Sequence, residues 1–161
     1  MTRKASGWDR EFRNNEYDED DHGTFTPNLV FVAMAFAPEM DEVYTAIKDE
    51  CKKQRLNTVR VDENAGSGLI IREITESIEQ AEFIIFDLTM ERPNVYYELG
   101  YAHGAGNDGN DIFLVAHADT KLHFDIAPLR VETYSTTEQL RQLIATKFKA
   151  MVKRDRARRD N

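Results

Sequence analysis

Apolar residues are distributed along the chain in two patterns. Short continuous apolar runs, rich in β-branched and aromatic residues, occupy positions 29–36, 83–86 and 112–115. Runs of this kind predict strands that are buried on both faces of a sheet. Shorter segments at 58–61 and 131–134 predict two further strands.

Between these runs, apolar residues recur at helical spacing. One such stretch runs from Glu39 to Arg55, a second from Leu69 to about Gln80, and a third from about Pro93 to the glycines at 104–106. Proline suits the first position of a helix, and glycine suits its end. A last helix follows Ser-Thr-Thr-Glu at 135–138, which we interpret as a capping box, and it carries apolar residues as far as Met151.

This order of elements predicts an α/β fold. We expect a single three-layer Rossmann- or flavodoxin-like domain, with a mostly parallel sheet of about five strands and helices on both faces. The length of 161 residues fits one domain. We assign the domain to residues 28–152, a flexible acidic arm to residues 1–27, and a basic C-terminal tail to residues 153–161.

The charge distribution bears on the partners of the protein. The net charge of −8 divides into −3 for residues 1–27, −10 for residues 28–146 and +5 for residues 147–161. A folded region of −10 would repel a phosphate backbone, so a nucleic-acid partner is disfavoured. The basic run at the C-terminus could bind an anionic partner, although such runs are more often solvated helix ends.

Other function classes are excluded by what the sequence lacks. No apolar run approaches the length of a membrane span, and the first residues carry no apolar segment of a secretory signal. The single cysteine, Cys51, excludes an intramolecular disulfide and is interpreted as a small buried hydrophobic residue. The four histidines show no ligand spacing. We therefore expect a cytoplasmic protein with no membrane partner, no metal and no cofactor.

Ligands of open parallel sheets bind beyond the carboxyl ends of the strands, so the residues there are candidates for function. Asp87 directly follows the apolar run 83–86 and could serve a ligand or cap the following turn. Gly66-Ser67-Gly68 precedes a helix, and its backbone N–H groups could hold a phosphate. Ser67 as an ordinary helix cap explains this segment equally well.

Glu98 is the sharper candidate. In a helix that starts near Pro93, Asn94 and Glu98 are four residues apart and share a face. Val95 and Ala102 give the carboxylate small and apolar neighbours, and the nearby helix N-terminus favours its ionised form. Such a carboxylate can act as a nucleophile or stabilise a developing cation, whereas the alternative is a solvated first-turn glutamate.

At these residues the sequence resembles the nucleoside 2-deoxyribosyltransferase superfamily, and more closely its bacterial TIR-like nucleotide-binding branch. The resemblance covers roughly residues 29–134 and is carried by segments 30–36, 66–70, 86–89 and 92–103. It implies that Glu98 attacks the anomeric carbon and that Asp87 binds the ribosyl group or helps to protonate the leaving base. It also implies a homo-oligomer and a substrate-binding set of Ala35, Phe36, Gly66, Ser67, Gly68, Asn94, Tyr97 and Tyr101.

The sequence also departs from that pattern. The well-known transferases carry a further aspartate shortly before the glutamate motif, where this chain has Glu91, Arg92 and Asn94. Phe36, the candidate for stacking on a base, could equally belong to the core.

The leading hypothesis is an N-ribosyl hydrolase or transferase, acting on a nucleoside, a nucleotide or nicotinamide dinucleotide. The alternative is a non-catalytic nucleotide-binding sensor, or an interaction module of a bacterial defence or signalling system. In the catalytic case Asp87 and Glu98 share one cavity, closed by Phe36 and Tyr97 or Tyr101. Repulsion between the two carboxylates would make one of them bind a proton more tightly than a free carboxyl group does.

Overall fold

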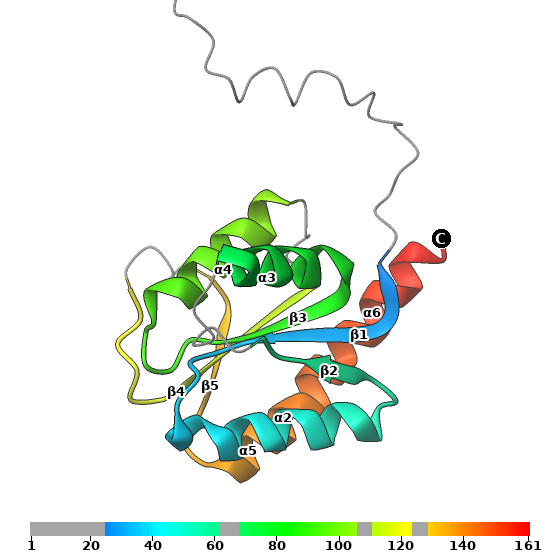
Figure 1. Ribbon diagram of the computed structural model, residues 1–161. Helices are drawn as coiled ribbons and strands as arrows, with labels where there is room; N and C mark the ends of the chain where they lie inside the picture. Colours follow the sequence, from blue (N-terminus) through cyan, green and yellow to red (C-terminus); the bar gives the residue numbers. More distant parts are fainter. Residues whose placement is uncertain (1–24, 62–67, 106–110, 124–128) are drawn as a thin grey trace, which may run out of the picture.

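The sheet is five-stranded and entirely parallel (Figure 1). A computed structural model describes residues 25–61, 68–105, 111–123 and 129–161. The strand order is β2-β1-β3-β4-β5, the flavodoxin-like order. The predicted α/β domain with helices on both faces is confirmed. The strands are β1 (Thr26–Ala33), β2 (Asn57–Val59), β3 (Ala81–Asp87), β4 (Ile112–His117) and β5 (Val131–Tyr134).

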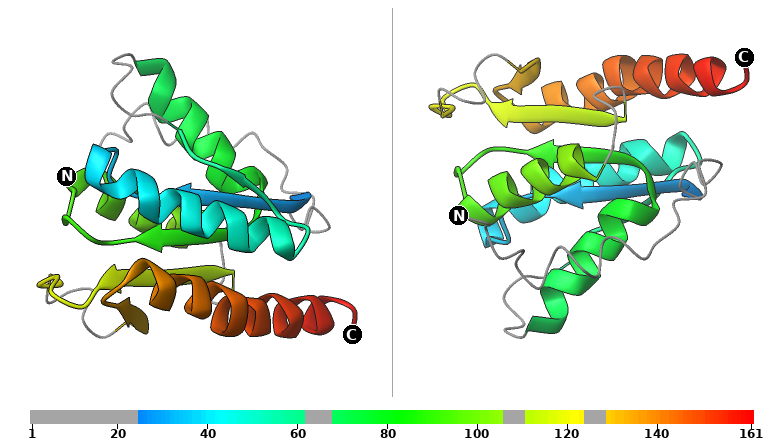
Figure 2. Two further views of the ribbon diagram at one scale, coloured as in Figure 1. Left: turned by 90° about the horizontal axis from the view of Figure 1, so that it is seen from below. Right: turned by 90° about the horizontal axis from the view of Figure 1, so that it is seen from above.

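Two layers of helices cover the sheet, as Figures 1 and 2 show. On one face lie α3 (Gly68–Gln80) and α4 (Pro93–Gly104). The other face is covered by elements from both ends of the domain, and Figure 2 shows them side by side. They are the short 3₁₀ turn η1 (Pro38–Met40), α2 (Asp41–Lys53), α5 (Thr137–Leu143), the π-helical segment η3 (Ile144–Phe148) and α6 (Lys149–Arg159).

The strands divide the core into two halves because successive side chains point to opposite faces. In β3, Phe83 and Ile85 pack with the cluster of α2, α5 and η3, whereas Ile84 and Phe86 pack with the cluster of α3 and α4. All four side chains are fully buried. The same alternation puts Asp87, the last residue of β3, on the α2–α5 face.

The expected limits of β1 and β3 need correction. We expected the first strand over 29–36, but β1 begins at Thr26 and ends at Ala33. Met34 and Ala35 stay buried after the strand has ended, so their apolar character reflects packing of a loop. β3 starts at Ala81 rather than 83, because Ala81 pairs with Thr26 of β1.

One helix cap also differs from expectation. α5 is capped by Thr136, whose hydroxyl accepts the Gln139 N–H at 3.1 Å, while the Gln139 side chain accepts the Ser135 N–H at 2.7 Å. The capping pair is therefore shifted by one residue from the predicted 135–138, since both pairs fit the same sequence pattern. α4 begins at Pro93, as predicted, with Arg92 as its N-cap. Glu98 therefore lies not in the first turn but in the second, where the helix dipole acts weakly.

The basic C-terminal run continues α6 as far as Arg159 and closes the amino edge of the sheet. Glu82 accepts from Arg156 Nε at 2.9 Å and from Arg159 Nη1 at 3.1 Å. The buried Asp155 bonds to Arg158 and Arg159. We call Glu82, Asp155, Arg156 and Arg159 the amino-edge cluster. Among the helices within the described ranges, none has the length and apolar character of a bilayer-crossing segment.

Candidate functional site at the carboxyl edge

A pocket of about 750 Å³ lies at the carboxyl ends of the strands, where the fold predicts a ligand. We call it the rim pocket. Its walls come from η1 and the start of α2, the loop after β3, the ends of β4 and β5, and the start of α5. The lining residues are Glu39, Met40, Glu42, Val43, Thr89, Met90, His117, Tyr134, Ser135, Thr136, Thr137 and Glu138.

Asp87 lies behind this pocket and is fully buried. One carboxylate oxygen accepts the Thr89 N–H at 2.8 Å, which is the turn-capping bond that we considered as the alternative role. The other accepts the Tyr134 hydroxyl at 2.7 Å. The Thr89 hydroxyl lies 3.3 Å from the Tyr134 hydroxyl and accepts the His117 N–H at 2.9 Å. Asp87 therefore acts on the pocket through Thr89 and Tyr134.

Burial shifts the protonation of this network. It raises the pKa of Asp87 above its ordinary value, although the hydrogen bonds from Thr89 and Tyr134 act in the opposite direction. Burial, followed by the charge of Asp87, also raises the pKa of Tyr134. The main cause of the raised pKa of Asp87 is desolvation, whereas we expected repulsion between two carboxylates.

The loop between β3 and α4 is held in an uncommon conformation. Met90 and Glu91 have φ values of 71° and 43°, in the left-handed region that favours glycine. The Glu91 N–H closes the turn on the Leu88 carbonyl at 3.1 Å. Met90 is 42% exposed and lines the rim pocket. Strain of this kind occurs most often at functional sites.

Glu98 is buried in α4, with 3% of its surface exposed. Its helical neighbours Val95, Leu99 and Ala102 pack into the core beneath α3 and α4. The alternative of a solvated glutamate is therefore wrong.

The structure does not bring Asp87 and Glu98 into the rim pocket. Asp87 belongs to the α2–α5 face, whereas α4 carries Glu98 over the opposite face. Neither carboxylate is among the residues that line the rim pocket.

The remaining predicted residues are scattered around the carboxyl edge. Ala35 is buried, and the half-buried Phe36 ring lies against Arg60. Asn94 is exposed, and Tyr97 is 61% exposed. The Tyr101 hydroxyl donates to Glu79, which raises its pKa to about 12. Gly66 and Ser67 lie outside the described residues, and Gly68 is the first residue of α3.

Sequence reasoning missed Tyr134, Thr89 and Arg60. Tyr134 ends an expected strand, and Thr89 follows Asp87 by two residues, so the carboxyl-edge rule could have found both. Arg60 closes the segment expected as the second strand and was not among the candidate residues. No sequence signal shows that its guanidinium is enclosed by aromatic rings.

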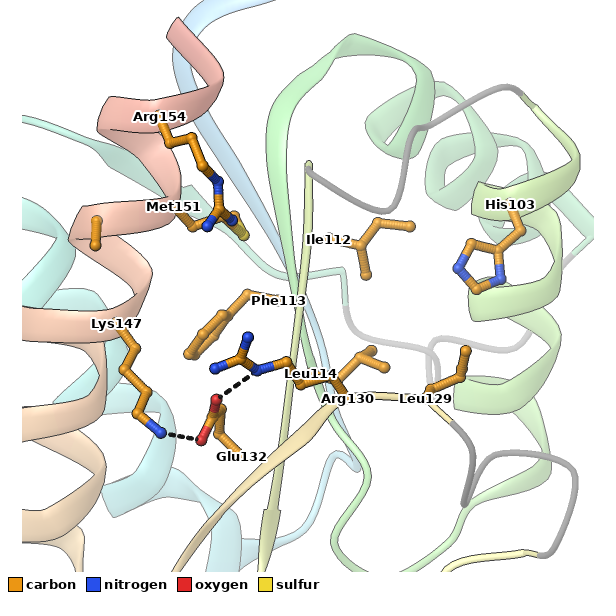
Figure 3. A pocket seen from close by; sticks show the side chains of 11 residues that line it. His103, Ile112, Phe113, Leu114, Leu129, Arg130, Glu132, Lys147, Met151 and Arg154 are labelled. Carbon is orange, nitrogen blue, oxygen red and sulfur yellow. Dashed lines mark hydrogen bonds and ion pairs between the residues drawn. The ribbon is translucent and has the colours of Figure 1, made fainter. Parts of the chain in front are cut away.

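A second pocket, of about 280 Å³, lies around the starts of β4 and β5 (Figure 3). Figure 3 shows the Glu132 carboxylate between Lys147 and Arg130, which it binds at 2.5 and 3.2 Å. The apolar wall comes from the first half of β4 and from Met151 of α6. Because it opens beside the starts of these strands, we do not assign the ligand site here.

Two further sequence predictions concern cysteine and metals. Cys51 is fully buried, as predicted, and burial raises its pKa to about 12. Its chemical inertness stays a prediction. Within the ranges that the structure describes, no three His, Cys, Asp or Glu side chains converge as metal ligands would.

Compared by sequence, the chain matches no protein-family model and no curated protein. In structure it is similar to the CMP N-glycosidase BcmB of Clostridium botulinum, with a TM-score of 0.56 and 16% identity over 72% of this chain and 97% of that one. A flavo di-iron protein of Thermotoga maritima gives a TM-score of 0.59 and 12% identity over 80% of this chain, but 37% of its own length.

The heterodimer of the RPS4 and RRS1 TIR domains also matches, with a TM-score of 0.51 and 16% identity over 76% of this chain and 97% of that one. At these identities the likeness concerns the fold. The chain therefore has a fold that a CMP N-glycosidase and TIR domains share.

Proposed function

We propose that the protein is an N-ribosyl hydrolase or transferase that cleaves the bond between C1′ and the base of a nucleoside or nucleotide, with Glu98 as nucleophile. The single observation that carries the proposal is the enclosure of the Glu98 carboxylate, 3% exposed, on the helix that follows the carboxyl end of β3. Enclosing a carboxylate is unfavourable, and groups held in this way cluster at functional sites. The fold shared with a CMP N-glycosidase supports the same assignment.

The reaction would use two displacements at C1′. A Glu98 oxygen attacks C1′ as the C1′–N bond breaks, and the electron pair of that bond leaves with the base, which takes up a proton. Water then displaces Glu98 from C1′ and gives up the matching proton, which completes hydrolysis. A second base in place of water completes transfer, which requires that water be excluded until that base arrives.

Asp87 would contribute through Tyr134 rather than by direct contact. Both of its oxygens already accept hydrogen bonds, and the Tyr134 hydroxyl is the member of the network that lines the rim pocket. In this role Asp87 fixes the orientation of the Tyr134 hydroxyl, which can form a hydrogen bond with a polar group of a ligand in the rim pocket. Asp87 is thus a positioning residue in the proposal.

The test is base release by the wild-type protein, by Glu98→Gln and by Glu73→Gln as a matched control on an exposed helix face. The substrates are deoxynucleosides, matched pairs of nucleoside and nucleoside 5′-monophosphate, and nicotinamide dinucleotide. We expect release from at least one substrate, lost by at least about a thousandfold in Glu98→Gln and unchanged in the control. Turnover that survives Glu98→Gln in a folded protein contradicts the assignment.

A non-catalytic nucleotide-binding sensor is the second candidate. The observation that favours it is the engagement of Asp87, whose two oxygens are both used inside the fold. Nucleotide binding without release of base from any substrate in the panel would support the sensor. If the protein neither binds a nucleotide nor releases base, the remaining candidate is an interaction module.

A further inference from the structure

Arg60 lies at the carboxyl edge with its guanidinium enclosed between two aromatic rings. Its Cζ atom is 4.1 Å from the ring centre of Phe36 and 4.1 Å from that of Tyr44. Arg60 follows β2, Phe36 follows β1, and Tyr44 lies in the first turn of α2. Three elements thus meet at one cation, and stacking on both rings favours one orientation of the guanidinium plane.

The edge of this guanidinium retains hydrogen-bonding capacity. Nη1 is buried and has no hydrogen-bond partner. Nη2 lies 3.8 Å from Asp41 Oδ1, too far for a hydrogen bond, and the Asp41 side chain is 66% exposed while that of Arg60 is 11% exposed. Buried donors in folded proteins nearly always have an acceptor, above all when they carry charge. The described residues supply none for Nη1.

The chemistry of the site selects an anionic ligand with paired oxygens. A guanidinium presents its N–H groups as a planar fork, which matches two oxygens of a phosphoryl group. The ring centres of Phe36 and Tyr44 each lie 4.1 Å from Cζ, which favours approach of such a group along the edge of the guanidinium. The neighbouring rim is acidic, with Glu39, Glu42 and Glu138 around the rim pocket. Arg60 supplies a positive charge for an anionic group at this edge.

We propose that Arg60, held between Phe36 and Tyr44, binds a phosphoryl group of the ligand, so that the substrate is a nucleotide rather than a free nucleoside. This inference rests on the proposed function and narrows its substrate class. The phosphoryl group belongs to a nucleoside 5′-monophosphate or to the pyrophosphate of nicotinamide dinucleotide, and the arms of the test separate these two sources. Phe36 then acts by orienting Arg60, rather than by stacking on the base.

The experiment compares the wild-type protein with Arg60→Met, Arg60→Lys and the control Arg72→Met, which removes an exposed arginine on α3. Arg60→Met keeps an apolar chain between the rings without charge, and Arg60→Lys keeps the charge without the fork. For each protein, kcat/KM is measured with CMP, cytidine, AMP, adenosine and nicotinamide dinucleotide. Binding of CMP, AMP and nicotinamide dinucleotide is measured separately by calorimetry.

We expect Arg60→Met to lower kcat/KM about ten- to hundredfold for the phosphorylated substrate and to leave the matching nucleoside unchanged. The kcat/KM of Arg60→Lys for the phosphorylated substrate should lie between the values of Arg60→Met and the wild type. Arg72→Met should behave as wild type. Equal losses for nucleotide and nucleoside would overturn the inference, because Arg60 would then only pack the edge. A larger loss for nicotinamide dinucleotide than for either monophosphate would identify the pyrophosphate as the ligand.

The calorimetry separates failure of this inference from failure of the proposed function. If no substrate releases base, the proposed function fails, and CMP binding that Arg60→Met weakens still supports a phosphoryl site at Arg60. If none of CMP, AMP and nicotinamide dinucleotide binds the wild-type protein more tightly than Arg60→Met, the inference is wrong whatever the turnover. If Arg60→Met does not fold, the same comparisons are made with Arg60→Lys.

Discussion

Buried charged groups have different hydrogen-bond partners at the two edges of the sheet. At the amino edge, Glu82 accepts from Arg156, from Arg159 and from the Asn28 N–H at 2.7 Å. At the carboxyl edge, Asp87 accepts from two neutral donors, the Thr89 N–H and the Tyr134 hydroxyl, and Nη1 of Arg60 has no partner among the described residues. Both carboxylates belong to β3 and both are buried.

The pKa values follow this difference. Burial alone would raise the pKa of Glu82, but hydrogen bonds from Arg156 and Asn28, together with the charges of Arg156 and Arg159, hold it below its ordinary value. The pKa of Asp87 is raised, because no charged arginine offsets its burial. The paired charges of the amino edge thus stabilise the fold, whereas the carboxyl edge retains hydrogen-bonding groups that a ligand can use.

The largest effect on stability should come from breaking the amino-edge cluster. Glu82→Gln leaves Arg156 and Arg159 without their shared carboxylate, and we expect the free energy of unfolding to fall by about 2–3 kcal/mol in urea denaturation. Glu76→Gln, at an exposed pair with Arg72, should change it by less than about 0.5 kcal/mol. Similar losses in the two variants would show that the cluster is no stronger than a surface pair.

The pH dependence of stability should sharpen the contrast between the edges. The stabilisation from Glu82 is present above its unfolded pKa near 4.5 and is lost as pH falls towards its lowered folded pKa. Asp87 behaves oppositely: its raised folded pKa favours the protonated native form, so stability falls as pH rises upward from 3.8.

Glu82→Gln should therefore flatten the loss of stability in acid, and Asp87→Asn should flatten the decline as pH rises from 3.8. The measurement is a series of denaturation curves from acid to neutral pH. Changes of the same sign in both variants would mean that the two edges do not differ in this respect.

At the carboxyl edge, the cap of α5 gives a smaller effect. Thr136→Ala removes the acceptor of the Gln139 N–H, and we expect a loss of about 1 kcal/mol. Ser135→Ala keeps the backbone N–H that Gln139 accepts, so thermal unfolding should change little. A larger loss in Ser135→Ala would restore the capping box at 135–138.

The smallest effect should come from the start of the described chain. The Arg159 guanidinium lies 4.4 Å from the ring centre of Phe25, so Phe25→Ala should cost about 0.5–1 kcal/mol. A chain that begins at Phe25 should keep the stability of the full protein, since residues 1–24 offer few apolar anchors. A large loss of thermal stability on removing residues 1–24 would show that the arm packs on the domain.

Much of the fold could be predicted because its signals are local. The runs at 83–86 and 112–115 are apolar on every residue, and only a strand buried on both faces requires that. The predicted strand 29–36 was wrong at both ends. Thr26 joins β1 because it pairs with Ala81, and Met34 is buried in the loop after the strand. Pairing and loop packing depend on residues far away in the chain.

The candidate site was predicted less completely. Asp87 was found because it follows a strand, yet its partner Tyr134 lies 47 residues further along the chain. Glu98 was found from a motif and a helical face, and its burial agrees with that prediction. The expectation that Glu98 and Asp87 share one cavity needed knowledge of which face of the sheet each one serves.

The sequence by itself determined the order of strands and helices, the parallel sheet and the burial of Cys51, because apolar periodicity acts over a few residues at a time. Only the tertiary structure decided how charge is distributed over the two edges. Arg156 meets Glu82 across 74 residues, and Arg60 meets Phe36 and Tyr44 because the ends of β1, β2 and α2 converge. Whether a buried charge has a partner depends on neighbours that are distant in sequence, and only the folded chain brings them close.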